Sequence, residues 1–127
     1  MTDRLQIEQL LRELYDARVQ GQLDRLCGVF AADARFRIAG ASDGKPIAIT
    51  ASGIKEIRQW LTVMLKTFRL TRFQLVTTLV DGASASVQWK VDIHSKITGV
   101  VVPTELVDLV EVREGRVVSY REFFAPC

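Results

Sequence analysis

A single carboxylate stands on the apolar face of a predicted strand near the end of the chain. In the stretch ELVDLVEV, residues 105–112, alternation places Asp108 on the same face as Leu106, Val110 and Val112. A carboxyl group in apolar surroundings is poorly solvated when ionised, so its pKa should rise. Asp108 would then stay protonated near neutral pH and could donate a hydrogen bond to a carbonyl or enolate oxygen. The alternative is a strand-edge carboxylate held by hydrogen bonds.

The elements that must position Asp108 change in kind along the chain. Apolar residues at spacings of three and four predict helices at 3–20, 22–31 and 52–68. Alternation and turn signals predict strands at 34–39, 47–50, 70–80, 84–97, 104–112 and 116–124. Helices followed by an antiparallel meander favour an α+β fold. We expect one domain over residues 1–127, with a curved antiparallel (mixed) sheet wrapped around the N-terminal helices as a cone-shaped barrel with an internal pocket.

Composition excludes several classes of function. The chain has 127 residues, 48% hydrophobic and 25% charged, with a net charge of only +2, so no nucleic-acid partner is expected. Neither a signal peptide nor an apolar run long enough to cross a bilayer is visible, so no membrane partner is expected. The cysteines, Cys27 and Cys127, show no zinc spacing and no reason to pair. We expect a cytoplasmic protein without a metal or organic cofactor.

Both ends of the chain resemble one family. The stretch YDARVQGQLDRLCGVFAADARFRIAG, residues 15–40, and the stretch VDLVEVREGRVVSYREFF, residues 107–124, resemble the opening and the closing hairpin of nuclear-transport-factor-two-like domains. These domains include the SnoaL-like polyketide cyclases and the ketosteroid isomerases. The resemblance implies the cone-shaped fold and places Asp108 where the isomerases keep a carboxylic acid and the cyclases an acid/base Asp. It says less about function, because one fold hosts many activities.

The other isomerase residues are missing from the matching positions. The resemblance puts the general-base position on Ile38 and the oxyanion-binding Tyr position on Leu14, with Tyr15 one step away. One step on a helix is a rotation of about 100°, so Tyr15 is not a simple substitute. A steroid isomerase mechanism is therefore not expected.

SnoaL-like cyclases place a histidine near the Asp on the neighbouring strand, and His94 lies on that strand here. Pairing His94 directly with Asp108 would bring the two Cβ atoms within about 5 Å of each other. Shifting the register by one residue would instead set Ser95 opposite Asp108 and turn His94 outward. Amphipathicity favours the second register, and the sequence leaves both open.

A second enzymatic interpretation uses other residues. The stretches WKVD, residues 89–92, and YREFF, residues 120–124, resemble the limonene epoxide hydrolases, which implies a site built from Lys90, Asp92 and Glu122. In such a site one carboxylate activates a water while a protonated one donates to the epoxide oxygen. Lys in place of Arg weakens the match, because Lys lacks the planar fork that holds two carboxylates.

Aromatic residues complete the predicted site. Tyr15 and Trp60 could line a pocket for a small hydrophobic or cyclic ligand, although aromatics at helical spacing also build cores. Trp89, with Val87, Val91 and Ile93, could form an outward strip that joins a homodimer.

These observations favour a SnoaL-like enzyme with acid/base chemistry (cyclisation, isomerisation or dehydration) on a cyclic or polyketide-like carbonyl compound, with Asp108 and His94 as the catalytic pair. The rivals are a non-catalytic ligand-binding or dimerisation domain and an epoxide hydrolase.

Overall fold

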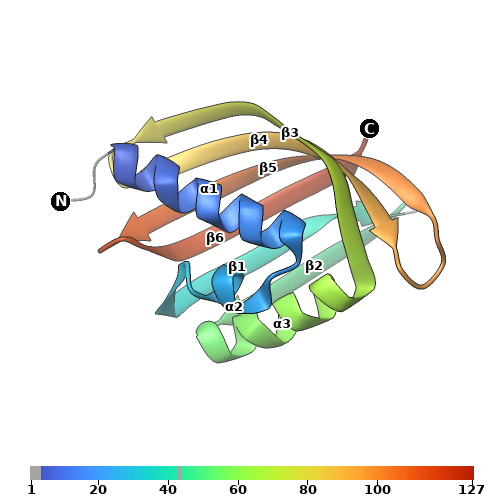
Figure 1. The fold of residues 1–127 in the computed structure, drawn as a ribbon, viewed down its shortest axis with the longest axis horizontal. Coiled ribbons are helices and arrows are strands. Elements are labelled where there is room, and N and C mark those ends of the chain that lie inside the picture. The colour runs from blue at the N-terminus through green and yellow to red at the C-terminus, as the bar shows by residue number, and fades with distance from the viewer. Residues whose placement is uncertain (1–3, 43) are drawn as a thin grey trace.

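The computed structural model describes residues 4–42 and 44–127 and confirms an α+β fold (Figure 1). Its helices are α1 (Arg4–Gln20), α2 (Leu23–Cys27) and α3 (Ile54–Thr67). Its strands are β1 (Phe30–Ser42), β2 (Lys45–Ser52), β3 (Phe68–Asp81), β4 (Ser84–Ser95), β5 (Val101–Arg113) and β6 (Arg116–Pro126). The predicted second helix, 22–31, is therefore too long. It ends at Cys27, and Phe30 already pairs with Val117 in the sheet.

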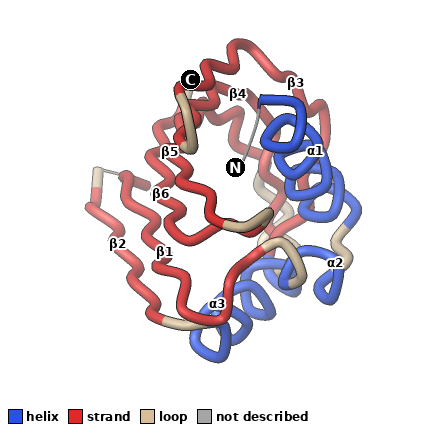
Figure 2. Tube along the Cα trace, turned by 90° about the vertical axis from the view of Figure 1, so that its left-hand side faces the viewer, coloured by secondary structure: helices blue, strands red, loops and turns tan. Residues whose placement is uncertain are grey.

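The six strands form one mixed sheet in the order β2-β1-β6-β5-β4-β3. β1 and β6 run parallel, and the other neighbours are antiparallel. The sheet curls around the helices but leaves β2 and β3 as free edges (Figure 2). The predicted curved sheet around the helices is therefore confirmed, although the sheet is not closed into a barrel. Helices, not strand pairing, cover the open side, with α1 lying against β3 and α3 against β1 and β2.

The concave face of the sheet and the inner faces of the helices share one core. α1 contributes Ile7, Leu11 and Leu14, and α3 contributes Ile57 and Leu61. The strands contribute apolar residues at alternate positions, including Phe36, Ile38, Ala85, Val87, Trp89, Val91, Leu106, Val110 and Val112. Since the side chains of Val87 and Trp89 are already 0% exposed in a single chain, the predicted dimer strip is wrong. It is the inner face of β4, and a homodimer through some other surface stays a prediction.

The β4–β5 register differs from both registers considered from the sequence. Asp108 lies opposite Val87, and His94 lies opposite Val101. The cause is the hairpin loop, which spans 96–100 and begins where the Ser95 amide N–H donates to the Val100 carbonyl oxygen. Because the turn comes earlier, β4 is shifted along β5 by eight residues relative to the register that amphipathicity favoured. Eight is an even number, so the side chains of β4 stay on the faces that this register gave them. Asp108 and the apolar residues of β4 therefore do share the concave face.

Gly40 marks a close approach between β1 and β6, and it provides a test of this packing. A Cβ at residue 40 would lie 2.5 Å from the carbonyl oxygen of Phe124 and 2.6 Å from its ring. We expect Gly40→Ala to lower the free energy of unfolding by about 1–3 kcal/mol, because backbone cannot move aside cheaply. The control is Ala39→Ser, which also adds one atom but on the outer face, and should cost under about 0.5 kcal/mol in urea unfolding. Equal costs for the two variants would contradict the close approach.

Candidate functional site

Asp108 lies at the centre of a buried polar cluster. Three donors converge on its Oδ2 atom: the Tyr15 hydroxyl at 2.5 Å, the Tyr120 hydroxyl at 2.7 Å and the Trp89 indole N–H at 2.8 Å. Its Oδ1 atom is buried and has no hydrogen-bond partner among the described residues. An unpaired buried oxygen is costly, so this atom needs an explanation in the chemistry of the site.

A second carboxylate, Glu122, lies directly across the β5–β6 ladder from Asp108. The Arg18 guanidinium holds it with two N–H groups, one on each carboxylate oxygen, the longer contact being 3.2 Å. Arg18 also donates to the Tyr120 hydroxyl oxygen at 3.2 Å and lies 5.1 Å from the centre of the Trp89 ring. The Tyr120 hydroxyl in turn lies 2.9 Å from Glu122 Oε1, so it bridges the two carboxyl groups.

Local structure explains why these six side chains meet. On α1, Tyr15 and Arg18 are three residues apart and therefore share the inward face of the helix. On β6, Tyr120 and Glu122 are two residues apart and therefore share the concave face of the sheet. We call this group the buried cluster; its members are Tyr15, Arg18, Trp89, Asp108, Tyr120 and Glu122.

The charges of the buried cluster favour a neutral Asp108. Burial, and next the charge of Glu122, raises the pKa of Asp108 to about 7. Burial alone would lower the pKa of Arg18, but Glu122 holds it well above its ordinary value. Burial and the nearby Asp108 raise the pKa of both Tyr15 and Tyr120. With Asp108 protonated, one guanidinium faces one carboxylate and the cluster carries no net charge.

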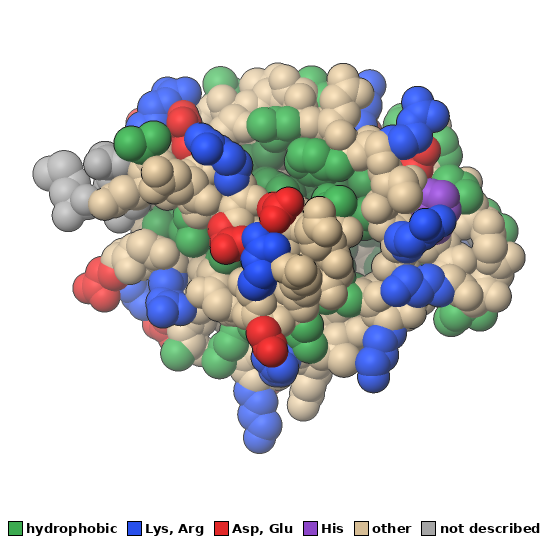
Figure 3. Space-filling view, viewed as in Figure 1, with side chains coloured by type: hydrophobic (Ala, Val, Ile, Leu, Met, Phe, Trp, Pro, Cys, Tyr) green, Lys and Arg blue, Asp and Glu red, His purple; other side chains and the backbone are tan. Residues whose placement is uncertain are grey.

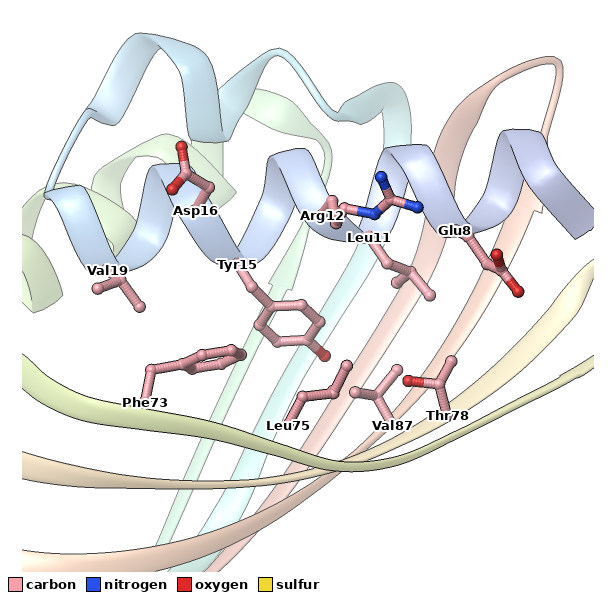
Figure 4. Close-up of a pocket in the computed structure, with 10 residues that line it drawn as sticks. All are labelled: Glu8, Leu11, Arg12, Tyr15, Asp16, Val19, Phe73, Leu75, Thr78 and Val87. Carbon is pink, nitrogen blue, oxygen red and sulfur yellow. The ribbon is translucent and has the colours of Figure 1, made fainter.

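A groove of about 510 Å³ runs between α1 and β3, and we call it the α1–β3 groove. Figure 3 shows apolar side chains in this hollow with charged side chains at its rim. The residues that line it are Glu8, Leu11, Arg12, Tyr15, Asp16, Val19, Phe73, Leu75, Thr78 and Val87 (Figure 4). Its size suits a small organic ligand.

Tyr15 connects the groove to the buried cluster. Its ring lies in the groove, at the edge of Trp89 with a centroid distance of 5.3 Å and beside Phe73 at 5.8 Å. Its hydroxyl points toward the strands, where it reaches Asp108 (Figure 4). Val87, opposite Asp108 on β4, also lines the groove. A ligand in the groove would therefore meet Tyr15 first and Asp108 behind it.

The structure brings together only some of the residues predicted from the sequence. Asp108, Tyr15 and Glu122 meet in the buried cluster. Tyr15 does so although it is one step from the position that the isomerase resemblance indicated. Trp60 on α3 is 39% exposed and lies outside the residues that line the groove.

His94 does not meet Asp108. Seven residues of β4 separate it from Val87, which is about 23 Å along a strand. Its ring nitrogens instead lie 2.6 Å from the Thr71 hydroxyl and 3.4 Å from the Arg69 guanidinium. The predicted His94–Asp108 pairing is wrong, whereas the outward position of His94 that the second register implied is correct.

Lys90 and Asp92 do not meet Glu122. They share the outer face of β4, where Lys90 is exposed and Asp92 lies 3.8 Å from Arg72, while Glu122 is buried on the concave face. The predicted grouping of these three residues is therefore wrong. A sheet separates the first two from the third.

Sequence reasoning missed Arg18, Trp89 and Tyr120. A signal for Arg18 was present, because it follows Leu11 by seven residues and Leu14 by four and so continues the buried stripe of α1. A buried arginine requires a carboxylate partner. Trp89 and Tyr120 gave no such signal, since an aromatic residue on a strand is usually part of the hydrophobic core.

Among residues 4–42 and 44–127, no group of three or more His, Cys, Asp or Glu side chains is placed to hold a metal ion. Within the same residues, no helix has the length and apolar character needed to cross a membrane.

Comparison with known proteins assigns the family. The SnoaL-like domain profile matches residues 11–120, most of the chain and nearly all of the buried cluster. The chain belongs to the SnoaL-like domain family. None of the curated proteins matches it in sequence.

Solved structures place this SnoaL-like domain among NTF2-like folds. An inferred isomerase from Bacillus subtilis has a TM-score of 0.84 at 21% identity, covering 98% of this chain and 90% of that one. An NTF2-like protein from Burkholderia xenovorans LB400 has a TM-score of 0.80 at 18% identity, with coverages of 98% and 93%. An LEH-like epoxide hydrolase from M. tuberculosis has a TM-score of 0.74 at 14% identity, with coverages of 95% and 84%. At these identities the similarity establishes the fold alone.

Proposed function

We propose that this SnoaL-like domain is an enzyme that performs acid/base chemistry on a cyclic or polyketide-like carbonyl compound bound in the α1–β3 groove. One observation carries the proposal: Tyr15 lines the groove, and its hydroxyl is a partner, at 2.5 Å, of a buried carboxyl group whose pKa is about 7. This pair would form the acid side of the site.

The protonation state of Asp108 would control where the Tyr15 proton points. An ionised Asp108 accepts the hydroxyl proton of Tyr15 and turns it away from the groove. A neutral Asp108 can carry its proton on Oδ2 and donate to the Tyr15 oxygen, which frees the Tyr15 proton for a ligand oxygen. Tyr15 would then donate a hydrogen bond that stabilises the developing enolate, and the hydrogen bond from Asp108 to the Tyr15 oxygen would strengthen this donor.

The base side of the site would come from α1. Of the carboxylates that line the groove, Glu8 points toward the strands and Asp16 points away (Figure 4). Glu8 and Tyr15 are seven residues apart, so their Cα atoms are separated by about 10 Å along the helix. A ligand of one or two fused rings would span that distance, with its carbonyl oxygen at Tyr15 and an acidic C–H near Glu8. His94 takes no part in this arrangement.

Binding of an enolate analogue tests the acid side. 2-Naphthol has the ring size of the proposed intermediate, and its hydroxyl oxygen stands in for the oxyanion. We expect Tyr15→Phe to weaken 2-naphthol binding about 3- to 10-fold, the effect of removing one hydrogen bond. Asp108→Asn should also weaken it, and fluorescence titration near pH 6 measures both. His94→Gln is the control and should bind like the unmodified chain.

Exchange of protons in a bicyclic ketone tests catalysis itself. NMR in D₂O should show faster hydrogen exchange next to the carbonyl of 2-decalone with the protein than with Tyr15→Phe, by about 100-fold or more. Binding of 2-naphthol without any exchange would contradict an enzyme and leave the ligand-binding domain. Unchanged naphthol binding by both Tyr15→Phe and Asp108→Asn would remove the site altogether.

One observation favours epoxide hydrolysis as a second candidate. Asp108 and Glu122 form a pair of buried carboxyl groups, in which Asp108 has a raised pKa and Glu122 is paired with the Arg18 guanidinium. A neutral acid beside a carboxylate base is the combination that opening an epoxide with water requires. Diol formation from styrene oxide that Glu122→Gln abolishes would support this candidate over the first.

A further inference from the structure

A second cleft, of about 440 Å³, lies on the convex side of the sheet, where β2, β1 and β6 run side by side (Figure 2). Three arginines line it: Arg35 and Arg37 from β1 and Arg121 from β6. All three side chains are exposed, on strands whose alternate residues Phe36 and Tyr120 are buried in the core. The cleft is thus on the opposite face from the α1–β3 groove.

The strand registers arrange these arginines among hydroxyl groups. One row across the sheet reads Thr50, Arg37 and Arg121, because Arg37 pairs with both of the other residues. The next row reads Ser52, Arg35 and Ser119. Neighbouring strands are about 4.8 Å apart and alternate residues of one strand about 6.7 Å, so the three arginine stems surround a space the size of one tetrahedral anion.

Within the part of the chain that the structure describes, the three arginines of this cleft form no ion pair, because no carboxylate lies within the 4.0 Å of an ion pair with Arg35, Arg37 or Arg121. Glu56 lines one edge of the cleft, but its Oε1 atom accepts the Ser52 backbone N–H at 2.9 Å. Glu111 is one strand further away, opposite Ser119. Like charges directly opposite on neighbouring strands, as in Arg37 and Arg121, destabilise a sheet unless an anion separates them.

We propose that this cleft binds a phosphoryl group. Three guanidinium forks can each give two parallel N–H groups to a tetrahedral dianion, and the hydroxyls of Thr50 and Ser119 can supply further donors. The Phe123 ring, 6.0 Å from the Arg37 guanidinium, supports that side chain in its outward position. The ligand would be a phosphate monoester or inorganic phosphate, bound at the back of the strand that carries Tyr120 and Glu122 into the buried cluster.

Calorimetric titration with inorganic phosphate at low ionic strength tests the proposal. The unmodified chain should bind phosphate with a Kd near or below about 1 mM. Arg37→Gln/Arg121→Gln should weaken binding about 10- to 100-fold, since each lost contact is a charge-assisted hydrogen bond. The double variant Arg37→Lys/Arg121→Lys keeps the charge but loses the planar guanidinium groups. Its affinity for phosphate should lie between those of the unmodified chain and the double glutamine variant.

The matched control is Lys66→Gln/Lys90→Gln, which removes the same charge from exposed positions away from the cleft. It should bind phosphate like the unmodified chain. Backbone amide shifts in NMR should move at 35–37 and 119–121 on adding phosphate and stay unchanged on adding the same concentration of acetate. The proposal is overturned if phosphate up to 10 mM (about tenfold above the expected Kd) gives no binding, if the lysine control weakens it equally, or if acetate binds as tightly.

Discussion

Arg18→Met should lower the free energy of unfolding by about 3–5 kcal/mol, the largest effect we expect of a single substitution. The substitution leaves Glu122, which is 2% exposed, as a buried carboxylate without its cation. Methionine keeps most of the length of the arginine stem, so lost packing contributes little. Urea unfolding at pH 7 measures the change.

Two further variants separate the charge effect from packing. Arg25 also contacts two carboxylates, Glu13 and Asp16, but at exposed positions, so Arg25→Met should cost far less stability than Arg18→Met. Arg18→Met/Glu122→Leu removes both buried charges and should recover most of the lost stability. If Arg18→Met costs no more than Arg25→Met, Glu122 is not held as a buried ion.

The stability of the protein should fall as pH rises through the range in which Asp108 ionises. The pKa of Asp108 is about 7 in the folded chain and about 3.9 in an unfolded one. Between these values the folded state binds more protons, so its advantage is complete below about pH 4 and lost above about pH 7. The contribution of Asp108 to the free energy of unfolding should therefore drop by about 2–3 kcal/mol between pH 5 and pH 8.

Asp108→Asn isolates this contribution, because asparagine keeps the shape and does not titrate. Other groups act in the opposite direction: the Arg113 guanidinium lowers the pKa of Asp33, which adds stability as pH rises. Both proteins share that effect, so the difference between their urea unfolding curves at pH 5 and pH 8 reports Asp108 alone. A difference that stays constant with pH, or that changes with the opposite sign, would contradict a raised pKa.

The inward face of Asp108 was predictable from the sequence, because a period of two residues needs only the strand itself. The residue of β4 that lies opposite Asp108 was not predictable in the same way. It depends on the position of the hairpin turn, which lies at 96–100 and not at the 98–103 left between the predicted strands, and this difference places His94 away from the site. Small errors in a turn thus become large errors in which side chains meet.

Which residue of a helix faces the site was also only partly predictable from the sequence. The stripe of α1 predicted its buried face, but the resemblance alone put the key position at Leu14 and not at Tyr15. Leu14 and Tyr15 are both buried, and the curl of the sheet around α1 lets one pack into the core while the other reaches Asp108. How far a sheet curls depends on the packing of the whole chain, so it cannot be predicted from a local sequence pattern.

The position of the last strand has a consequence for how the chain folds during synthesis. β6 lies in the middle of the sheet, between β1 and β5, so until β6 is in place the other strands can pair only as two separate ribbons, β2–β1 and β5–β4–β3. Until then β1 exposes one unpaired edge to solvent, and such edges attract other chains. Completing the sheet joins residues such as Phe36 and Tyr120, more than eighty positions apart. The sheet can therefore be completed only after β6 has been synthesised, and the pairing of such distant segments is intrinsically slow.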